Sequence, residues 1–135
     1  MGFVHRDIKP GNIMYRSDGT PVLVDMGLLK RVGSTEESIA RKDPVLSVVD
    51  GKAVGVGTPR YAAPEQFNGG EISPAADIHA LGMLINECFK GELKGCWERI
   101  VARATSSIPE RRYRDVSEFM RAVRHRHWHV FGIAV

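Results

Sequence analysis

The stretch Val4–Met14 reads VHRDIKPGNIM and concentrates reactive side chains on what we expect to be one short loop. The side chains that it brings together are those of His5, Arg6, Asp7, Lys9 and Asn12. Taken singly, Asp and Asn residues in loops most often cap helices or form turns. The significance of this stretch therefore depends on the residues that follow it.

A β-hairpin is predicted directly after this loop. Ile13–Tyr15 and Val22–Val24 are short apolar runs, and Ser17–Gly19 between them favours a turn. Asp25 stands at the end of the returning strand. Because a hairpin brings its two ends together, we expect Asn12 and Asp25 to face each other across it.

Two oxygen ligands at a strand end suit Mg²⁺, which binds few protein oxygens and keeps positions for water and phosphate. Asn12 and Asp25 are the candidate ligands. Asp7 precedes the hairpin and is placed to accept a proton near such a metal. Lys9 adds a cation where phosphate charge would lie, and Gly27 lets the backbone change direction after Asp25.

Composition narrows the class of protein. The chain has 135 residues, enough for one domain, and a formal net charge of +3, which requires no nucleic-acid partner. Its two cysteines make neither a disulfide framework nor a zinc site, which fits reduced thiols in the cytoplasm. No apolar run approaches the roughly 20 residues of a membrane span. We therefore expect a cytoplasmic protein that binds neither nucleic acid nor membrane.

Helices are predicted in the second half of the chain. Ala75–Phe89 is apolar nearly all round, follows a possible cap at Ser73, and is expected to be buried. Apolar stripes at helical spacing follow in Trp97–Ala104 and in Val116–Val123, the latter behind a capping-box pattern. A second hairpin is expected in Val45–Val56. The predicted fold is mainly α (α+β): a β-hairpin with a reactive loop, a long polar segment, then three helices.

Five motifs, in the right order, resemble the protein kinase family. They are HRDIKPGN (His5–Asn12), VDMG (Val24–Gly27), GTPRYAAPE (Gly57–Glu65), DIHALG (Asp77–Gly82) and PERRY (Pro109–Tyr113). They are similar to the catalytic loop, the metal-binding turn, the end of the activation segment, the central buried helix and a late arginine motif. The Lys9 form of the loop together with GTPRY resembles the serine/threonine branch, and APEQ resembles bacterial members.

The resemblance implies transfer of the γ-phosphoryl group of ATP to a protein hydroxyl, with Mg²⁺ as cofactor. Asp7 would orient the substrate hydroxyl and accept its proton, and Lys9 would contact the transferring phosphoryl group. Asn12 and Asp25 would hold Mg²⁺.

Other positions would support the site. His5 and Arg6 would be scaffold, with Arg6 also able to meet a phosphate on the activation segment. Thr58 would hydrogen-bond into the catalytic loop, and Asp77 would brace that loop from the central helix.

Glu65 would pair with Arg112. The open alternatives are a buried ion pair, whose loss costs about 3–5 kcal/mol, and a surface pair worth less than about 1 kcal/mol.

Candidate phosphorylation sites fall in the long segment from Asp25 to Glu65. They are Ser34, Thr35, Ser38 and Ser47. Phosphorylation there could order the segment through Arg6. The simpler alternative is that these side chains only make a loop polar.

The sequence also departs from the family pattern. A Gly-rich loop, a strand lysine, its partner glutamate and the helix before HRD are not found, and Met26 replaces the usual Phe. We therefore expect a C-terminal lobe portion in residues 1–124, a partial kinase-like domain, and a tail in residues 125–135. Expected partners are a protein substrate and either a complementing N-lobe or a second copy. The alternative is a non-catalytic, kinase-like interaction module.

Overall fold

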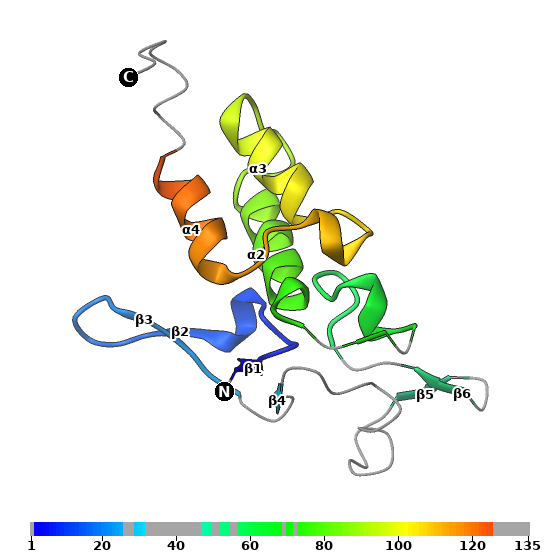
Figure 1. Ribbon diagram of the computed structural model, residues 1–135. Helices are drawn as coiled ribbons and strands as arrows, with labels where there is room; N and C mark the ends of the chain where they lie inside the picture. The colour runs from blue at the N-terminus through cyan, green and yellow to red at the C-terminus, as the bar shows by residue number, and fades with distance from the viewer. Residues whose placement is uncertain are drawn as a thin grey trace.

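The fold was described from a computed structural model, in which residues 2–25, 29–31, 47–49, 52–54, 57–68, 70–71 and 73–125 are described. In that part of the chain, three α-helices pack together and short paired strands lie at one end of them (Figure 1). The mainly α (α+β) prediction is confirmed at this level. The tail predicted for residues 125–135 lies outside the described residues except for His125.

The first hairpin is confirmed. Strand β2, Ile13–Tyr15, pairs antiparallel with β3, Pro21–Leu23, with Ile13 opposite Leu23. Two backbone hydrogen bonds close the turn. Arg16 donates its N–H to Thr20 O, and Gly19 donates its N–H to Arg16 O, both at 2.9 Å. Strand β3 begins one residue before the predicted start. Val24 follows its end and donates its N–H to Asn12 O at 2.8 Å.

Two further strand pairs are described. Strands β5, Ser47–Val49, and β6, Lys52–Val54, pair antiparallel as predicted, although the expected turn at residues 50–51 lies outside the described residues. Strand β1, Phe3–Val4, pairs antiparallel with β4, Lys30–Arg31, a pairing that the sequence did not predict. Val4 is fully buried and packs with Ala63 and Ala76.

The central helix α2 spans Pro74–Cys88 and ends one residue before the predicted Phe89. Ser73 is its N-cap residue, but the Ser73 side chain makes no capping hydrogen bond, so that prediction was wrong in its mechanism. The prediction that the helix is buried along its whole length was also wrong. Its buried residues are Ala75, Ala76, Ile78, His79, Ala80 and Gly82. These residues all lie in the N-terminal part of the helix, whereas residues 83–87 are only partly buried and Cys88 is exposed.

Helices α3, Cys96–Ala104, and α4, Val116–Arg124, pack on α2 around the main apolar core. That core consists of Ile78, Ile100, Ala104, Tyr113 and Phe119. Gly82 permits the close approach of α2 to α3, because a Cβ atom there would lie 2.8 Å from Thr105 Cγ2 and 2.9 Å from Ala104 Cβ.

The start of α4 is capped much as predicted. The Asp115 carboxylate accepts a hydrogen bond from the Glu118 N–H at 2.7 Å. The Glu118 carboxylate reaches back to the Arg114 N–H at 2.6 Å, one residue before the N-cap residue that a regular capping box would use. Helix α4 is thus fixed at its first turn by two carboxylates.

Short 3₁₀ turns complete the described elements: η1 at Pro10–Asn12, η3 at Pro64–Gln66 and η4 at Pro109–Arg111. Both cysteines, Cys88 and Cys96, are free thiols. Among the helices that the structure describes, none has the length and apolar character needed to cross a membrane.

Candidate active site

The loop that contains Asp7 is anchored to the first turn of α2. The Asp77 carboxylate accepts hydrogen bonds from the His5 N–H at 2.7 Å and from the Arg6 N–H at 2.9 Å. Burial raises the pKa of the Asp77 carboxyl, and the two backbone donors only partly offset this effect. Arg6 has a φ of 70°, in the left-handed region that residues other than glycine seldom adopt. The two hydrogen bonds to the backbone of His5 and Arg6 are the contacts expected if Asp77 braces the loop.

His5 connects the same loop to the end of the hairpin. Its Nδ1 accepts a hydrogen bond from the Asp7 N–H at 3.3 Å, so its Nε2 carries the proton and donates to Val24 O at 3.2 Å. The ring is buried. The His5 ring therefore connects Asp7 to Val24, the residue before Asp25, while its role as scaffold of the site stays a prediction.

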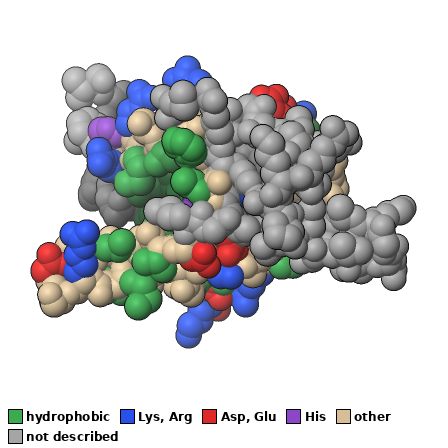
Figure 2. Space-filling view, turned by 90° about the horizontal axis from the view of Figure 1, so that it is seen from below, with side chains coloured by type: hydrophobic (Ala, Val, Ile, Leu, Met, Phe, Trp, Pro, Cys, Tyr) green, Lys and Arg blue, Asp and Glu red, His purple; other side chains and the backbone are tan. Residues whose placement is uncertain are grey.

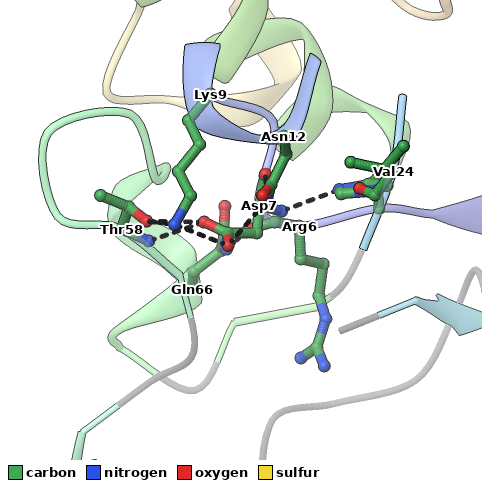
Figure 3. Close-up of polar contacts among 8 residues, drawn as sticks. Arg6, Asp7, Lys9, Asn12, Val24, Thr58 and Gln66 are labelled. Atoms are coloured by element: carbon green, nitrogen blue, oxygen red, sulfur yellow. Dashed lines mark hydrogen bonds and ion pairs between the residues drawn. The ribbon is translucent and has the colours of Figure 1, made fainter. Parts of the chain in front are cut away.

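Asp7 lies at the centre of a polar cluster (Figure 3). Its Oδ1 accepts from the Thr58 N–H at 3.2 Å and from Thr58 Oγ1 at 2.7 Å. Its Oδ2 lies 3.1 Å from Lys9 Nζ and accepts from Asn12 Nδ2 at 3.2 Å. Burial acts to raise the pKa of Asp7, but the bonds from Thr58, Lys9 and Asn12 outweigh it and hold the pKa below its usual value. Asp7 is consequently an ionised carboxylate at neutral pH.

Lys9 and Thr58 complete the cluster. Lys9 Nζ donates to Thr58 Oγ1 at 2.8 Å, while the Thr58 hydroxyl proton is given to Asp7. Thr58 lies 49 residues beyond Lys9 in the sequence. The segment that begins at Gly57 is therefore hydrogen-bonded directly to the loop. This is the contact that the kinase resemblance implied for Thr58.

Asn12 is buried, and its Nδ2 also donates to the Asp7 carbonyl oxygen at 2.8 Å. With the amide nitrogen used in this way, Oδ1 is the Asn12 atom suited to a hard cation. Val24 donates its N–H to Asn12 O and therefore lies opposite Asn12. Asp25 is the next residue after Val24. Asp25 itself is exposed and has a φ of 63°. The backbones are thus brought together, and convergence of the two side chains stays a prediction.

Asn12 and Asp25 carry oxygen donors of the kind that Mg²⁺ binds. Within the described residues, no group of three or more His, Cys, Asp or Glu side chains is arranged to hold a metal ion. An amide oxygen and a carboxylate, supplemented by water and phosphate, are the hard ligands that Mg²⁺ accepts.

Glu65 and Arg112 form the predicted pair, and it is buried. The Arg112 guanidinium donates to the two Glu65 oxygens at 2.6 and 2.9 Å, and the Arg112 side chain is fully inaccessible to solvent. The same guanidinium also donates to Ala75 O and Ser106 O. A cavity of about 710 Å³ borders the pair, but its lining includes neither Asp7 nor Asn12.

Four residues that make side-chain hydrogen bonds near the loop and the central helix were not singled out from the sequence. Gln66 Nε2 donates to Arg6 O at 2.9 Å, and His79 Nδ1 donates to Tyr61 O at 3.0 Å. The Tyr61 hydroxyl donates to the Glu87 carboxylate. The only sequence signals were a Gln directly after the motif ending at Glu65, and a polar His on the otherwise apolar start of the central helix.

Four of the predicted residues lie outside the part of the chain that the structure describes. Gly27, Ser34, Thr35 and Ser38 lie outside the described residues, and Ser47 is described only as the start of β5. Figure 3 shows the Arg6 side chain pointing away from the Asp7 cluster, and it is 2% exposed. The predicted contact of Arg6 with a phosphate therefore stays a prediction.

The sequence of this chain is similar to known proteins over most of its length. The sequence pattern of the protein kinase domain matches residues 1–126. The chain belongs to the protein kinase family. It is 34% identical over 110 residues to the serine/threonine-protein kinase drp72 of Corynebacterium efficiens, covering 82% of this chain and 19% of that protein. The resemblance read from the five motifs is confirmed.

Two further kinase relatives support the serine/threonine branch. The serine/threonine-protein kinase PknB of Mycolicibacterium smegmatis is 29% identical over 128 residues, covering 90% of this chain and 19% of the relative. The serine/threonine-protein kinase PknD of Mycobacterium tuberculosis is 38% identical over 90 residues, covering 67% of this chain and 12% of the relative. The chain thus spans about a fifth or less of the length of these relatives.

Proposed function

We propose that these residues form the catalytic-loop part of a serine/threonine protein kinase, which transfers the γ-phosphoryl group of ATP to a hydroxyl group of a protein. The observation that carries the proposal is the Asp7 carboxylate, held by Thr58 on one oxygen and by Lys9 and Asn12 on the other. Phosphoryl transfer depends mainly on positioning and electrostatics. A fixed, ionised carboxylate beside a lysine supplies both.

In this proposal Asp7 orients the attacking hydroxyl group and accepts its proton. Its lowered pKa keeps it available as a base at neutral pH. Lys9, whose Nζ lies 2.8 Å from Thr58 Oγ1, contributes positive charge beside the phosphoryl group during its transfer. Asn12 and Asp25 would hold Mg²⁺, which neutralises phosphate charge when bound.

The nucleotide needs a second surface, because the 135 residues contain no Gly-rich loop with a strand lysine. We propose that another segment supplies it, either from a longer chain or from a complementing copy. Large hydrophobic side chains near the loop support this, since Phe3, Met14 and Tyr15 are 57%, 58% and 72% exposed. Seen from below, the molecule exposes hydrophobic side chains beside charged ones (Figure 2).

The proposal is tested by phosphotransfer from Mg-ATP to serine- and threonine-containing peptides, using the full-length protein. We expect Asp7→Asn to lower the rate by about 10²- to 10⁴-fold, the usual contribution of a positioned base. Asp18→Asn makes the same chemical change at an exposed hairpin turn and should leave the rate unaltered. Equal rates for the wild type and Asp7→Asn would instead favour the non-catalytic interaction module.

A further inference from the structure

Gln66 lies at the end of η3 with its side chain buried and both ends of its amide bonded. Its Nε2 donates to Arg6 O at 2.9 Å, and its Oε1 accepts from the Ala63 N–H at 3.1 Å. The residue is 2% exposed. A buried amide bonded in this way has only one favourable orientation, because exchanging its oxygen and nitrogen would break both bonds.

The acceptor of Gln66 is the carbonyl group of the peptide that joins Arg6 to Asp7. Arg6 holds a left-handed φ of 70°, a conformation that persists only where the surroundings impose it. Its N–H is held by Asp77 Oδ1 at 2.9 Å, and its carbonyl group is held by Gln66. The residue before Asp7 is therefore fixed from two sides, by α2 and by η3.

Gly57 packs directly over this hydrogen bond. A Cβ atom at Gly57 would lie 2.9 Å from Gln66 Nε2 and 3.2 Å from Arg6 O, and its φ of +136° favours glycine as well. The next residue, Thr58, donates its N–H and its hydroxyl group to Asp7. Gln66 and Thr58 thus contact the Arg6–Asp7 unit together (Figure 3), and Gly57 lies against the Gln66–Arg6 hydrogen bond.

We propose that Gln66 is a positioning residue, which fixes the Asp7 carboxylate in its contact with Thr58 by holding the Arg6 carbonyl group. The inference rests on the proposed phosphotransfer and assigns no chemical step to Gln66 itself. It concerns a side chain whose partner is a backbone group, 60 residues away in the sequence.

Two variants of the full-length protein separate the contacts. Gln66→Glu keeps the size of the side chain and an acceptor for the Ala63 N–H, but places an oxygen against the Arg6 carbonyl group. Gln66→Met removes both bonds. Assayed well below their melting temperatures, both variants should lose kcat by roughly 10- to 100-fold, the effect of misplacing a catalytic group by about 1 Å. The KM values for ATP and peptide should change by less than about twofold, since neither ligand would contact Gln66.

Phe119→Leu serves as the control, because Phe119 is buried in the helical core away from the loop. It should lower the melting temperature while keeping the wild-type kcat per folded molecule. The proposal is overturned if the Gln66 variants melt earlier but keep the wild-type kcat. It is also overturned if Phe119→Leu loses as much kcat as they do, because the loss would then follow instability alone.

Amide hydrogen exchange provides a readout that does not depend on catalysis. The Thr58 N–H should lose protection in Gln66→Glu and keep it in Phe119→Leu. If the wild type transfers no phosphate, the proposed function fails, while this measurement still decides the positioning role. Loss of protection confined to Asp7 and Thr58 supports that role, and unchanged protection at both overturns it.

Discussion

Arg112 donates two hydrogen bonds to the carboxylate of Glu65, at 2.6 and 2.9 Å, from a side chain that solvent does not reach. The pair joins the end of the 57–66 segment to the turn before α4. Because the Arg112 guanidinium also holds Ala75 O and Ser106 O, one buried cation connects three parts of the chain. Its loss should therefore affect the fold as a whole.

Removing either partner should destabilise the protein strongly. We expect Arg112→Leu or Glu65→Gln to lower the free energy of unfolding by about 3–5 kcal/mol, since each leaves a buried charge without its partner. Arg112→Lys should recover only part of this, because lysine cannot make the paired contact. Urea unfolding measures the change. A loss below about 1 kcal/mol would instead be typical of a surface pair.

The two helix caps should differ in their contribution. Asp115→Ala removes the side chain that accepts from the Glu118 N–H and should cost about 1 kcal/mol of unfolding free energy. Ser73→Ala at the start of α2 should cost less, because the Ser73 side chain makes no capping hydrogen bond. Thermal unfolding of the two variants tests the difference. Equal losses would contradict the capping geometry.

His79 should make the protein less stable in mild acid. Burial lowers the pKa of His79 below its ordinary value of 6.5, and the nearby Arg112 charge adds to this. The hydrogen bond to Tyr61 O and the negative charge of Glu65 only partly oppose the lowering of this pKa. Below pH 6.5 the unfolded chain therefore binds a proton that the folded chain does not. The unfolding free energy should therefore decrease as the pH is lowered, by at most about 1.4 kcal/mol per pH unit.

This pH effect is measured by comparing His79→Gln with the wild type. Glutamine can still donate to Tyr61 O but does not titrate. Urea unfolding between pH 7.5 and 5.5 should show a shallower decline for the variant. Parallel curves would mean that His79 titrates alike in both states.

Thr58 should contribute to the rate through its hydroxyl group. Thr58→Val keeps the shape but removes the group that donates to Asp7 and accepts from Lys9. Loss of a hydrogen bond to a charged group is worth about 1.5–3 kcal/mol, which corresponds to roughly a 10- to 100-fold fall in kcat. Thr58→Ser retains the hydroxyl group and should stay near the wild-type rate. A rate for Thr58→Val equal to that for Thr58→Ser would contradict this role.

Asp25 should control the response to magnesium. Asp25→Ala should raise the Mg²⁺ concentration needed for half-maximal phosphotransfer by at least about tenfold, since even residues behind the metal ligands change affinity by 10- to 100-fold. Titration of the activity with MgCl₂ at fixed ATP measures this, with Asp18→Ala as the matched control. An unchanged magnesium requirement would remove Asp25 from the ligand set.

The hairpin and the helices could be predicted from the sequence because their apolar patterns are local. Three long-range contacts were predicted only from the kinase resemblance, because spacing alone cannot pair residues that are distant in the sequence. They are the contacts of the loop with Thr58 and with Asp77, and the pair of Glu65 and Arg112. The pairing of β1 with β4 was missed because strands of two residues carry no periodicity.

Gln66 was missed for a different reason, because its partner is a backbone carbonyl group, which is the same in every residue. The Ser73 cap failed because a residue type favours a hydrogen bond without ensuring it.

The pairing of β1 with β4 also couples two parts of the site mechanically. Val4 enters the Asp7 loop, and its strand partner Lys30 lies five residues beyond Asp25. Val4 is fixed against Ala63 and Ala76, so residues 30–31 cannot shift without displacing a buried side chain or breaking the ladder. A displacement of residues 30–31 would therefore break the β1–β4 pairing or move Val4, which leads into the Asp7 loop.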